Sequence, residues 1–240
     1  EWAARHGKIY DPSSTEQSKR YEQWLDNIAT VDEINHSPNM TWKATVENRF
    51  GDMSKEEFAK VMLLEPQSAA QLSAHSHPFK FSTRSAKLTK DTKDAAANYD
   101  WRDYGAVTPV KDQGTVGTCW AFSTIGNVEG QWFLSESELV GLSEEFLVDC
   151  DGTSDETHAD CSVFGGWPYL AYQFILGAGG VPTEESYPYC AGTGDCYPCM
   201  QGPVSLCGPP PYYCDRNITL ACPDAALYAS ITDWAEISPD

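Results

Sequence analysis

We expect an α+β protein, and the changes in charge and cysteine content along its 240 residues predict two functional units. Residues 1–96 hold 14 acidic and 13 basic residues, whereas residues 97–240 hold 21 acidic and 3 basic residues. All nine cysteines lie at or after Cys119. Apolar residues in the first unit recur at helical spacing. We expect a helical unit at 1–60, an extended basic segment or linker at 61–96, and a larger domain at 97–240.

The overall composition excludes several classes of protein. The chain is 41% hydrophobic and 21% charged, which is typical of a folded globular protein. Its net charge of −19 argues against nucleic acid as the main partner. No run of 18 apolar residues exists, so we expect no membrane span. The chain begins with Glu1 rather than Met, so we expect a removed leader or a fragment.

Cysteine density and two glycosylation acceptors indicate an oxidising, secretory route. Asn39 and Asn217 each begin an Asn-X-Thr sequon. Cys196 and Cys199 are spaced as in some zinc or redox sites, but disulfides are the better expectation for a secreted chain. We therefore predict neither a metal nor a cofactor.

Residues 12–35 are predicted to form the first long helix. Pro12 and the Ser-Ser-Thr run after it are a helix start signal, and the segment 36–38, His-Ser-Pro, is a stop signal. One apolar face follows from residues spaced by one or three positions. They are Tyr21, Trp24, Leu25, Ile28, Val31 and Ile34.

A second stripe on this helix carries a family resemblance. The stripe, spaced by three or four positions, resembles the "ERFNIN" helix of papain-family propeptides, with Trp for Phe and Val for Ile. A following element resembles the family's "GNFD" segment, although Val46 stands where that pattern has Gly. The simpler interpretation is an ordinary amphipathic helix and turn. The motif residues are Glu16, Arg20, Trp24, Asn27, Val31 and Asn35 on the helix, and Asn48, Phe50 and Asp52 after it.

Residues 65–96 lack helical or strand periodicity, and their basic residues favour a solvated linker. The resemblance implies more, because in the papain family this segment runs through the substrate cleft and is cut on activation. The basic residues are Lys80, Arg84, Lys87, Lys90 and Lys93.

The chemistry is expected at Cys119. A turn-rich stretch with Gly114 and Gly117 precedes it, and apolar residues at helical spacing follow. Cys119 is therefore predicted at a helix N-terminus, where the helix dipole favours a thiolate and unpaired N–H groups can bind an oxyanion. A cysteine in an apolar helix is more often a core residue, so the surrounding motif decides.

That motif resembles the papain-family signature. The segment 116–120, Val-Gly-Thr-Cys-Trp, keeps three of its five positions. The resemblance extends over nearly the whole chain and implies that Cys119 is the nucleophile and that the Gln113 side chain donates to the oxyanion. It also implies that Gly165 and Gly166 offer a backbone edge to an extended substrate, with Trp167 and Pro168 beside a side-chain pocket. Alternatives are a tight turn for the glycines and a core aromatic for Trp167.

Two departures from the family pattern matter. Val116 replaces a cysteine that normally bridges to the one before the Gly-Gly pair, so Cys161 must find another partner or stay free. The family's His and Asn lie about 130–150 residues after the nucleophile, beyond Asp240. We therefore interpret the sequence as truncated before them. His158, in an acidic loop, is expected to be a solvated residue rather than a base.

Eight cysteines remain as disulfide candidates once Cys119 is set aside, and they allow 105 connectivities. The resemblance implies a bridge from Cys150 to Cys190 or Cys196. Asn35 is also in a sequon but is expected to be structural. The candidates are Cys150, Cys161, Cys190, Cys196, Cys199, Cys207, Cys214 and Cys222.

The expected protein is thus a papain-like cysteine endopeptidase precursor that acts through a Cys119 thioester. Residues 97 to about 185 should form the helix-rich lobe, and 228–234 should open the β-barrel lobe. The resemblance implies peptide or protein substrates, inhibition by its own propeptide, a monomer, and a lysosome-like, vacuole-like or secreted location. The alternative is a non-catalytic propeptide-like inhibitor on a protease remnant.

Overall fold

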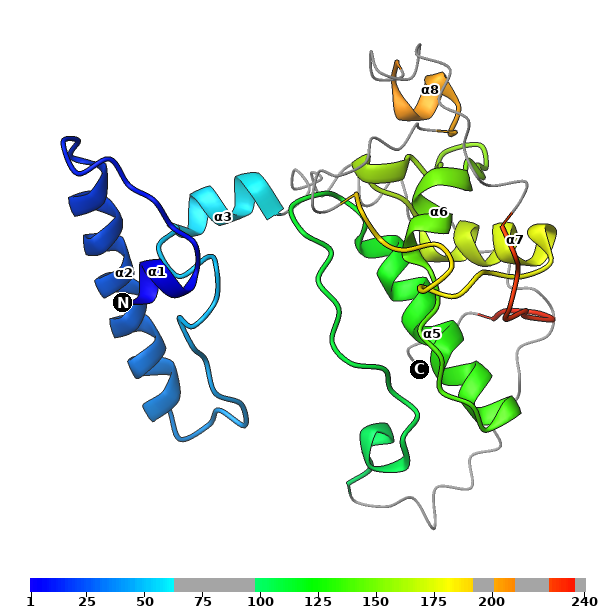
Figure 1. Cartoon of the computed structure of the whole chain (residues 1–240), viewed down its shortest axis with the longest axis horizontal. Coiled ribbons are helices and arrows are strands. Elements are labelled where there is room, and N and C mark those ends of the chain that lie inside the picture. The colour runs from blue at the N-terminus through cyan, green and yellow to red at the C-terminus, as the bar shows by residue number, and fades with distance from the viewer. Residues whose placement is uncertain (63–97, 192–200, 210–224, 236–240) are drawn as a thin grey trace. The chain divides into compact units, whose positions relative to one another are not determined.

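The computed structural model describes residues 1–62, 98–191, 201–209 and 225–235, and it contains two compact units (Figure 1). The units are Glu1–Pro66 and Gln67–Asp240. The first holds α1 (Trp2–Arg5), α2 (Glu16–His36) and α3 (Lys55–Met62). No helix in the described part of the chain is long and apolar enough to cross a membrane.

Helix α2 matches the predicted 12–35 helix but begins later, because residues 11–14 form a turn. The Ser13 amide donates to Asp11 Oδ1 at 2.8 Å, and the Glu16 amide donates to Ser14 Oγ at 3.2 Å. The side chains before the helix thus bind amides that lack intrahelical acceptors. The helix ends at His36, and extended Ser37 leads into Pro38.

The propeptide-like stripe of α2 lies against the loop of residues 44–53. Asn27 Nδ2 donates to the Gly51 and Met53 carbonyl oxygens at 2.8 and 2.9 Å. Asn35 accepts from the Ala44 amide and donates to its carbonyl, which confirms the structural role expected for it. Arg20 reaches the Asp52 carbonyl oxygen, whereas Glu16 is exposed.

The apolar face predicted for α2 is only partly correct. Tyr21 and Leu25 are 60% and 43% exposed, and no residue of α2 is fully buried. The loop of residues 44–53 docks on α2 through polar contacts, chiefly those of Asn27 and Asn35. Trp24 packs near Trp2, with ring centroids 6.2 Å apart. Side-chain hydrogen bonds to backbone carbonyl oxygens therefore contribute much of the attachment of the 44–53 loop to α2.

Asp52 anchors the end of the loop. Its buried carboxylate accepts from the Tyr10 hydroxyl at 2.5 Å and pairs with Lys8 Nζ at 2.9 Å. These contacts hold the pKa of Asp52 below its usual range although burial opposes them. Asn48 Oδ1 caps the Phe50 amide at 2.8 Å, and the Phe50 ring packs edge-on against Phe58.

The second unit is built around α5 (Cys119–Glu136). Helix α5 packs against α6 (Glu144–Cys150) and α7 (Pro168–Ala178), and two short 3-10 helices and a four-residue helix complete the described part. These last three are η2 (Trp101–Tyr104), η3 (Ser162–Phe164) and α8 (Val204–Cys207). The core is apolar and includes Trp120, Ile125, Val128, Leu142, Leu147, Val148, Ala171, Ile175 and Val181.

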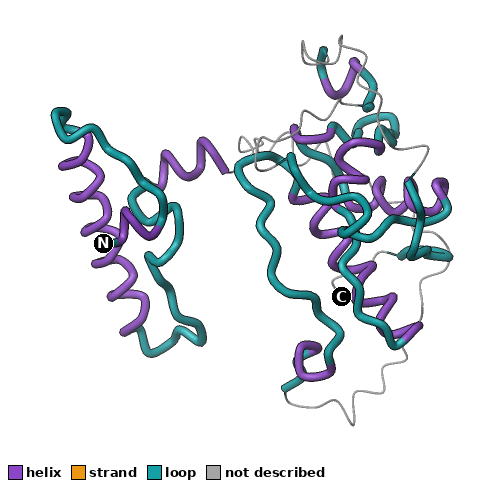
Figure 2. Tube along the Cα trace, in the orientation of Figure 1, coloured by secondary structure: helices purple, strands orange, loops and turns teal. Residues whose placement is uncertain are grey.

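The expected strand at 228–234 is a single bridge. Ala229 pairs with Val181 in an antiparallel bridge, and the described residues hold two other isolated bridges but no strand (Figure 2). A strand needs several successive hydrogen-bonded pairs with a neighbouring segment. In the described part, the backbone of this segment bonds only to the amide and the carbonyl oxygen of Val181. The regular secondary structure of the described residues is therefore helical.

Buried charges link the start of this unit to its helices. Lys111 Nζ donates to Glu129 Oε1 at 2.7 Å, to Glu144 Oε1 at 2.6 Å and to the Leu142 carbonyl oxygen at 3.1 Å. Glu145 accepts from the amides of Cys190 and Ala191 at 3.0 and 3.1 Å. Burial raises the pKa values of Glu144 and Glu145 to about 7 despite these favourable contacts.

These two groups predict that the second unit is more stable in mild acid than at pH 8. An unfolded glutamic acid loses its proton near pH 4.5, whereas the folded groups keep theirs to about pH 7. The native state therefore binds more protons across this window. Each group then lowers the free energy of unfolding by up to about 1.4 kcal/mol per pH unit as pH rises. Urea unfolding of the full chain at pH 5, 6, 7 and 8 measures this slope.

Glu145→Gln is the matched control, because its amide oxygen can still accept the Cys190 and Ala191 amides. We expect this variant to flatten the pH dependence and to be relatively more stable at pH 8. A wild-type chain whose stability rises steadily from pH 5 to pH 8 contradicts the assignment.

Candidate active site

Cys119 lies at the N-terminus of α5, as predicted, and its side chain is exposed and free. Thr118 is the N-cap residue, and its carbonyl accepts the Ala121 and Phe122 amides at 3.0 and 3.3 Å. The earliest amides of an α-helix have no intrahelical acceptor and carry the positive end of its dipole. A thiolate, or an oxyanion formed beside it, is stabilised at this place.

The loop before Cys119 is fixed by Tyr189. The Tyr189 hydroxyl donates to the Gln113 carbonyl oxygen at 2.8 Å and lies 2.7 Å from Thr118 Oγ1. One side chain therefore holds both ends of the 113–118 loop. The Gln113 side chain spans the loop as well, since its Nε2 donates to the Val116 carbonyl oxygen at 2.8 Å. A primary amide has a second N–H, so Gln113 keeps a donor beyond this bond.

Val116 stands where the papain-family pattern has a bridging cysteine, and hydrogen bonds to a short turn at residues 162–164 take the place of that disulfide. The Gly117 amide donates to the Val163 carbonyl oxygen at 2.8 Å, and Trp120 Nε1 donates to the Ser162 carbonyl oxygen at 3.1 Å. Val116 and Val163 both pack against the core. A Cβ on Gly117 would lie 2.8 Å from the Val163 oxygen, so this approach requires glycine. Hydrogen bonds on both sides of Cys119 thus tie η3 to the nucleophile loop.

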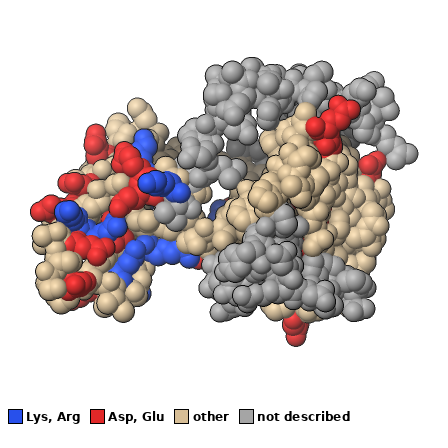
Figure 3. All heavy atoms as spheres, turned by 90° about the horizontal axis from the view of Figure 1, so that it is seen from above, with Lys and Arg blue, Asp and Glu red and all other residues tan. Residues whose placement is uncertain are grey.

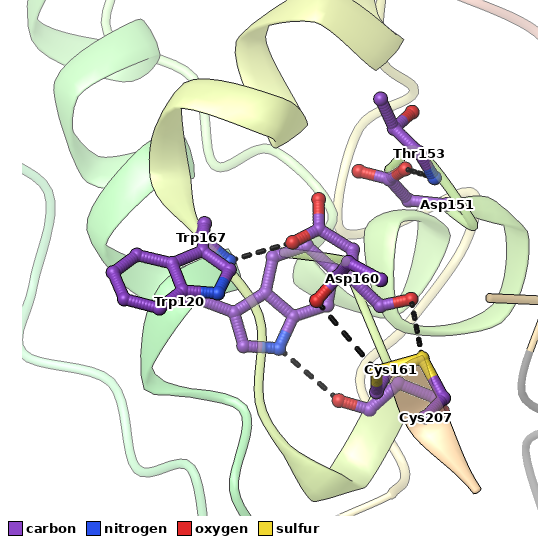
Figure 4. Close-up of a disulfide and its surroundings, with 9 residues drawn as sticks. Trp120, Asp151, Thr153, Asp160, Cys161, Trp167 and Cys207 are labelled. Carbon is purple, nitrogen blue, oxygen red and sulfur yellow. Dashed lines mark hydrogen bonds between the residues drawn. A yellow bond between two sulfur atoms is a disulfide. The ribbon is translucent and has the colours of Figure 1, made fainter. Parts of the chain in front are cut away.

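Cys161 forms a disulfide with Cys207 of α8 (Figure 4). Cys161 therefore has a partner other than the residue at position 116. Their Cα atoms are 5.4 Å apart. Cys150 and Cys190 are also disulfide-bonded, in agreement with their place among the candidates, while their pairing stays a prediction. The remaining candidates, Cys196, Cys199, Cys214 and Cys222, lie outside the described residues.

The predicted substrate-binding segment begins α7. Gly165 has φ +121°, and Gly166 approaches other groups so closely that a Cβ would lie 2.6 Å from Asp160 Oδ1 and from the Trp120 ring. Both glycines are therefore required by local geometry alone. Trp167 is the N-cap of α7 and Pro168 its first residue, where proline lacks no needed donor. Their contact with a substrate stays a prediction.

His158 is not the solvated loop residue expected from its acidic surroundings. Its side chain is buried, and its ring lies against Trp167 with centroids 4.2 Å apart. The Tyr169 hydroxyl lies 3.1 Å from His158 Nδ1. The loop folds back because Asp155 Oδ1 accepts the Thr157 and His158 amides. The acidic residues beside His158 in the sequence could not predict that its ring packs against aromatic residues of a later segment.

The remaining predicted sites lie on the surface or outside the described part. Asn39 is exposed, as a glycosylation acceptor must be, and Asn217 lies outside the described residues, as does the basic segment from Lys80 to Lys93. The described residues hold no cluster of three or more side chains suited to a metal. In Figure 3 acidic and basic side chains alternate over the visible face of the first unit.

Two family models match the chain. The model described as papain family cysteine protease matches residues 95–207, which include Cys119 and Gln113. The model described as cathepsin propeptide inhibitor domain matches residues 1–58, which include the Asn27 stripe. The order of the two matches is the order of the two units.

The curated relatives that the chain matches include proteins named as cysteine proteinases. Cysteine proteinase A of Leishmania mexicana is 38% identical over 197 residues, which cover 81% of this chain and 51% of that protein. Digestive cysteine proteinase 1 of Homarus americanus is 38% identical over 201 residues, covering 82% and 56%. The chain thus spans about half the length of the curated relatives it matches.

Solved proforms share the fold. The proform of the ragweed pollen cysteine protease Amb a 11 is 30% identical with a TM-score of 0.61, covering 84% of this chain and 59% of that one. Procathepsin L 3 of the Tenebrio molitor larval midgut is 34% identical with a TM-score of 0.55, covering 86% and 58%. Both structures include a proform, so the similarity extends over the propeptide-like unit as well.

The Cys161–Cys207 bridge predicts a stability change. The bridge closes a loop of 46 residues, so the double variant Cys161→Ala, Cys207→Ala should lower the free energy of unfolding by about 2–4 kcal/mol. Urea unfolding of the full chain, followed by tryptophan fluorescence, measures the loss. Cys119→Ala is the control, since an exposed free cysteine should change stability by less than about 0.5 kcal/mol. Equal stability of the double variant and the wild type would refute the constraint.

Proposed function

We propose, since this chain belongs to the papain family of cysteine proteases and carries a cathepsin-type propeptide, that it is the precursor of a cysteine endopeptidase. The observation that supports this most directly is the exposed, free Cys119 at the start of α5. The Cys119 thiolate attacks the peptide carbonyl carbon and forms a thioester as the amine leaves. Water then hydrolyses the thioester and releases the acid.

The oxyanion is stabilised by two donors in this proposal. One is the Cys119 backbone N–H, which belongs to the first turn of α5 and has no intrahelical acceptor. The other is the second side-chain N–H of Gln113, whose first bond to the Val116 carbonyl fixes the direction of the amide. Tyr189 keeps the two donors at a constant separation, because it binds the loop on both sides of Val116.

A peptidase that uses the Cys119 thiolate as its nucleophile also needs an imidazole base. The sequence holds five histidines, and none stands at the family's position after the nucleophile. His158 is occupied by Trp167 and Tyr169 in a separate cluster. We propose that the base and its orienting asparagine lie outside these 240 residues, since the chain spans about half the length of the curated relatives it matches.

We further propose that residues 1–96 act as an intramolecular inhibitor. Proform relatives support this order of units. The basic residues from Lys80 to Lys93 would lie on the acidic catalytic surface, since residues 97–240 carry a net charge of −18. Carboxylates with cationic partners lose that contribution as pH falls through their depressed pKa, so release in an acidic lysosome-like or vacuole-like compartment follows.

Substitution of Cys119 tests the proposed activity. In a form that includes the base, Cys119→Ala and Cys119→Ser should abolish turnover of a peptide substrate, while these 240 residues alone should hydrolyse none. The measurement is release of a fluorescent leaving group after propeptide removal. Turnover that persists in Cys119→Ala refutes the nucleophile. Turnover by the 240 residues that Cys119→Ala abolishes refutes the need for an outside base.

Gln113→Ala tests the oxyanion donor in the same assay. Loss of one such donor should lower kcat by about 10²–10³ with little change in KM. Urea unfolding of the variant shows whether the 113–118 loop is still held. An unchanged kcat in a folded variant contradicts the role of Gln113.

A further inference from the structure

Two aspartic acids outside the proposed catalytic machinery share a buried site. Asp151 ends α6, Asp160 precedes Cys161, and both side chains are 0% exposed. The loop between them folds back on itself, since the Asp160 amide donates to the Thr153 carbonyl oxygen at 2.9 Å and Ser154 pairs with Ala159. This return brings the two carboxyl groups into hydrogen-bond contact with one another.

The two carboxyl groups need a proton between them. Asp151 Oδ1 accepts the Thr153 amide at 2.8 Å, and Asp160 Oδ1 accepts the Trp167 amide at 2.6 Å. The remaining oxygen of each finds no donor from any other group in the described part. Two ionised carboxylates can only accept, so a hydrogen bond between them requires that one be protonated.

The pair holds this proton between its two members, because burial raises the pKa of Asp151 as well as that of Asp160. Burial and the neighbouring Asp151 carboxylate raise the pKa of Asp160 far above its usual range. Among described residues, no Lys or Arg pairs with either carboxyl group. The other titratable groups nearby are Tyr169 on α7, whose hydroxyl donates to Asp155, and His158 on the same loop. The disulfide, Trp120 and Trp167 that complete the surroundings are uncharged.

Asp160 also lies where the candidate substrate edge meets the nucleophile helix. Figure 4 shows its carboxyl group between Asp151 and the pair Trp120 and Trp167. Its Oδ1 binds the backbone amide that follows Gly166, and Gly166 itself is wedged between this oxygen and the Trp120 ring. Trp120 is the residue next to Cys119. The Asp160 acid therefore fixes the distance between the Gly165–Gly166 backbone and the start of α5.

We propose that Asp160 is a positioning residue, which shares one proton with Asp151 and holds the Gly165–Trp167 backbone in register with Cys119 for an extended peptide substrate. The inference rests on the proposed peptidase function for its purpose, but the geometry that it asserts can be measured without turnover. Loss of the shared proton at alkaline pH would place two negative carboxylates side by side in a buried site, and their repulsion would move Asp160 away from the Trp167 amide.

Amide hydrogen exchange of the full 240-residue chain tests the proposal. The readout is protection of the peptide that spans residues 162–170, corrected for the intrinsic pH dependence of exchange. Asp160→Asn keeps an acceptor for Trp167 and a donor for Asp151 but has no titrating proton. Asp160→Leu has a similar volume and neither bond. We expect Asp160→Leu to lower protection about five- to tenfold at every pH, and Asp160→Asn to stay within twofold of wild type at pH 6.

The alkaline limb gives a second readout that needs no disruptive variant. Wild-type protection should fall as pH rises through the high pKa of Asp160, whereas Asp160→Asn should show no such step. Asp151→Asn is the matched variant, because its amide can donate to an ionised Asp160, and it too should lack the step. If Asp160→Leu does not fold, this comparison alone decides the matter.

Three results overturn the proposal. These are a wild-type chain with no alkaline step, an Asp160→Asn variant as poorly protected as Asp160→Leu, and full protection in folded Asp160→Leu. In the active enzyme, Asp160→Leu should raise KM for an extended peptide more than it lowers kcat, and Asp160→Asn should restore KM. Absence of peptidase activity in every form refutes the proposed function but leaves the exchange result to judge Asp160.

Discussion

The buried indole of Trp120 is the contact on which the catalytic half depends. Trp120 follows exposed Cys119 directly, so burial of one side chain in the core directs the other to the surface. Its Nε1 binds the Ser162 carbonyl, and its ring sets how near Gly166 can come. Cys119, the 3-10 turn and Gly166 are thus all placed by one side chain. A smaller residue there would leave a cavity with all three elements around it.

Sequence reasoning found what short-range patterns encode. The helical spacing of apolar residues predicted α2, although not which of its side chains face inward, and the turn-rich stretch before Cys119 predicted a helix that starts at Cys119. It missed contacts between distant segments. Tyr189 binds residues more than 70 positions away, and Asp160 meets Trp167 only because the loop returns on itself. His158 was misjudged for the same reason, since its burial depends on Trp167 and not on its acidic neighbours.

The second unit buries acids beyond what its cations can neutralise. Lys111 serves both Glu129 and Glu144, whereas Glu145 depends on two backbone amides and Asp160 on Asp151. Such groups make the folded state take up protons, so mild acid favours it. This agrees with the acidic location proposed for the protein. In the first unit the opposite holds. The Tyr10 hydroxyl and Lys8 lower the pKa of Asp52, the Ser54 amide and Arg20 lower that of Glu57, and these contributions are lost at low pH.

The valine pair beside the nucleophile changes how the site responds to thiols. A cysteine peptidase works only while its own sulfur is reduced, and the small thiols that maintain it also attack strained or accessible disulfides. In this chain the link from the nucleophile loop to the substrate segment consists of the Gly117–Val163 hydrogen bond and apolar packing. The Cys161–Cys207 bridge begins two residues before Val163 and does not include the 113–118 loop. Reductant that keeps the Cys119 thiol free therefore meets no disulfide within the 113–118 loop before it.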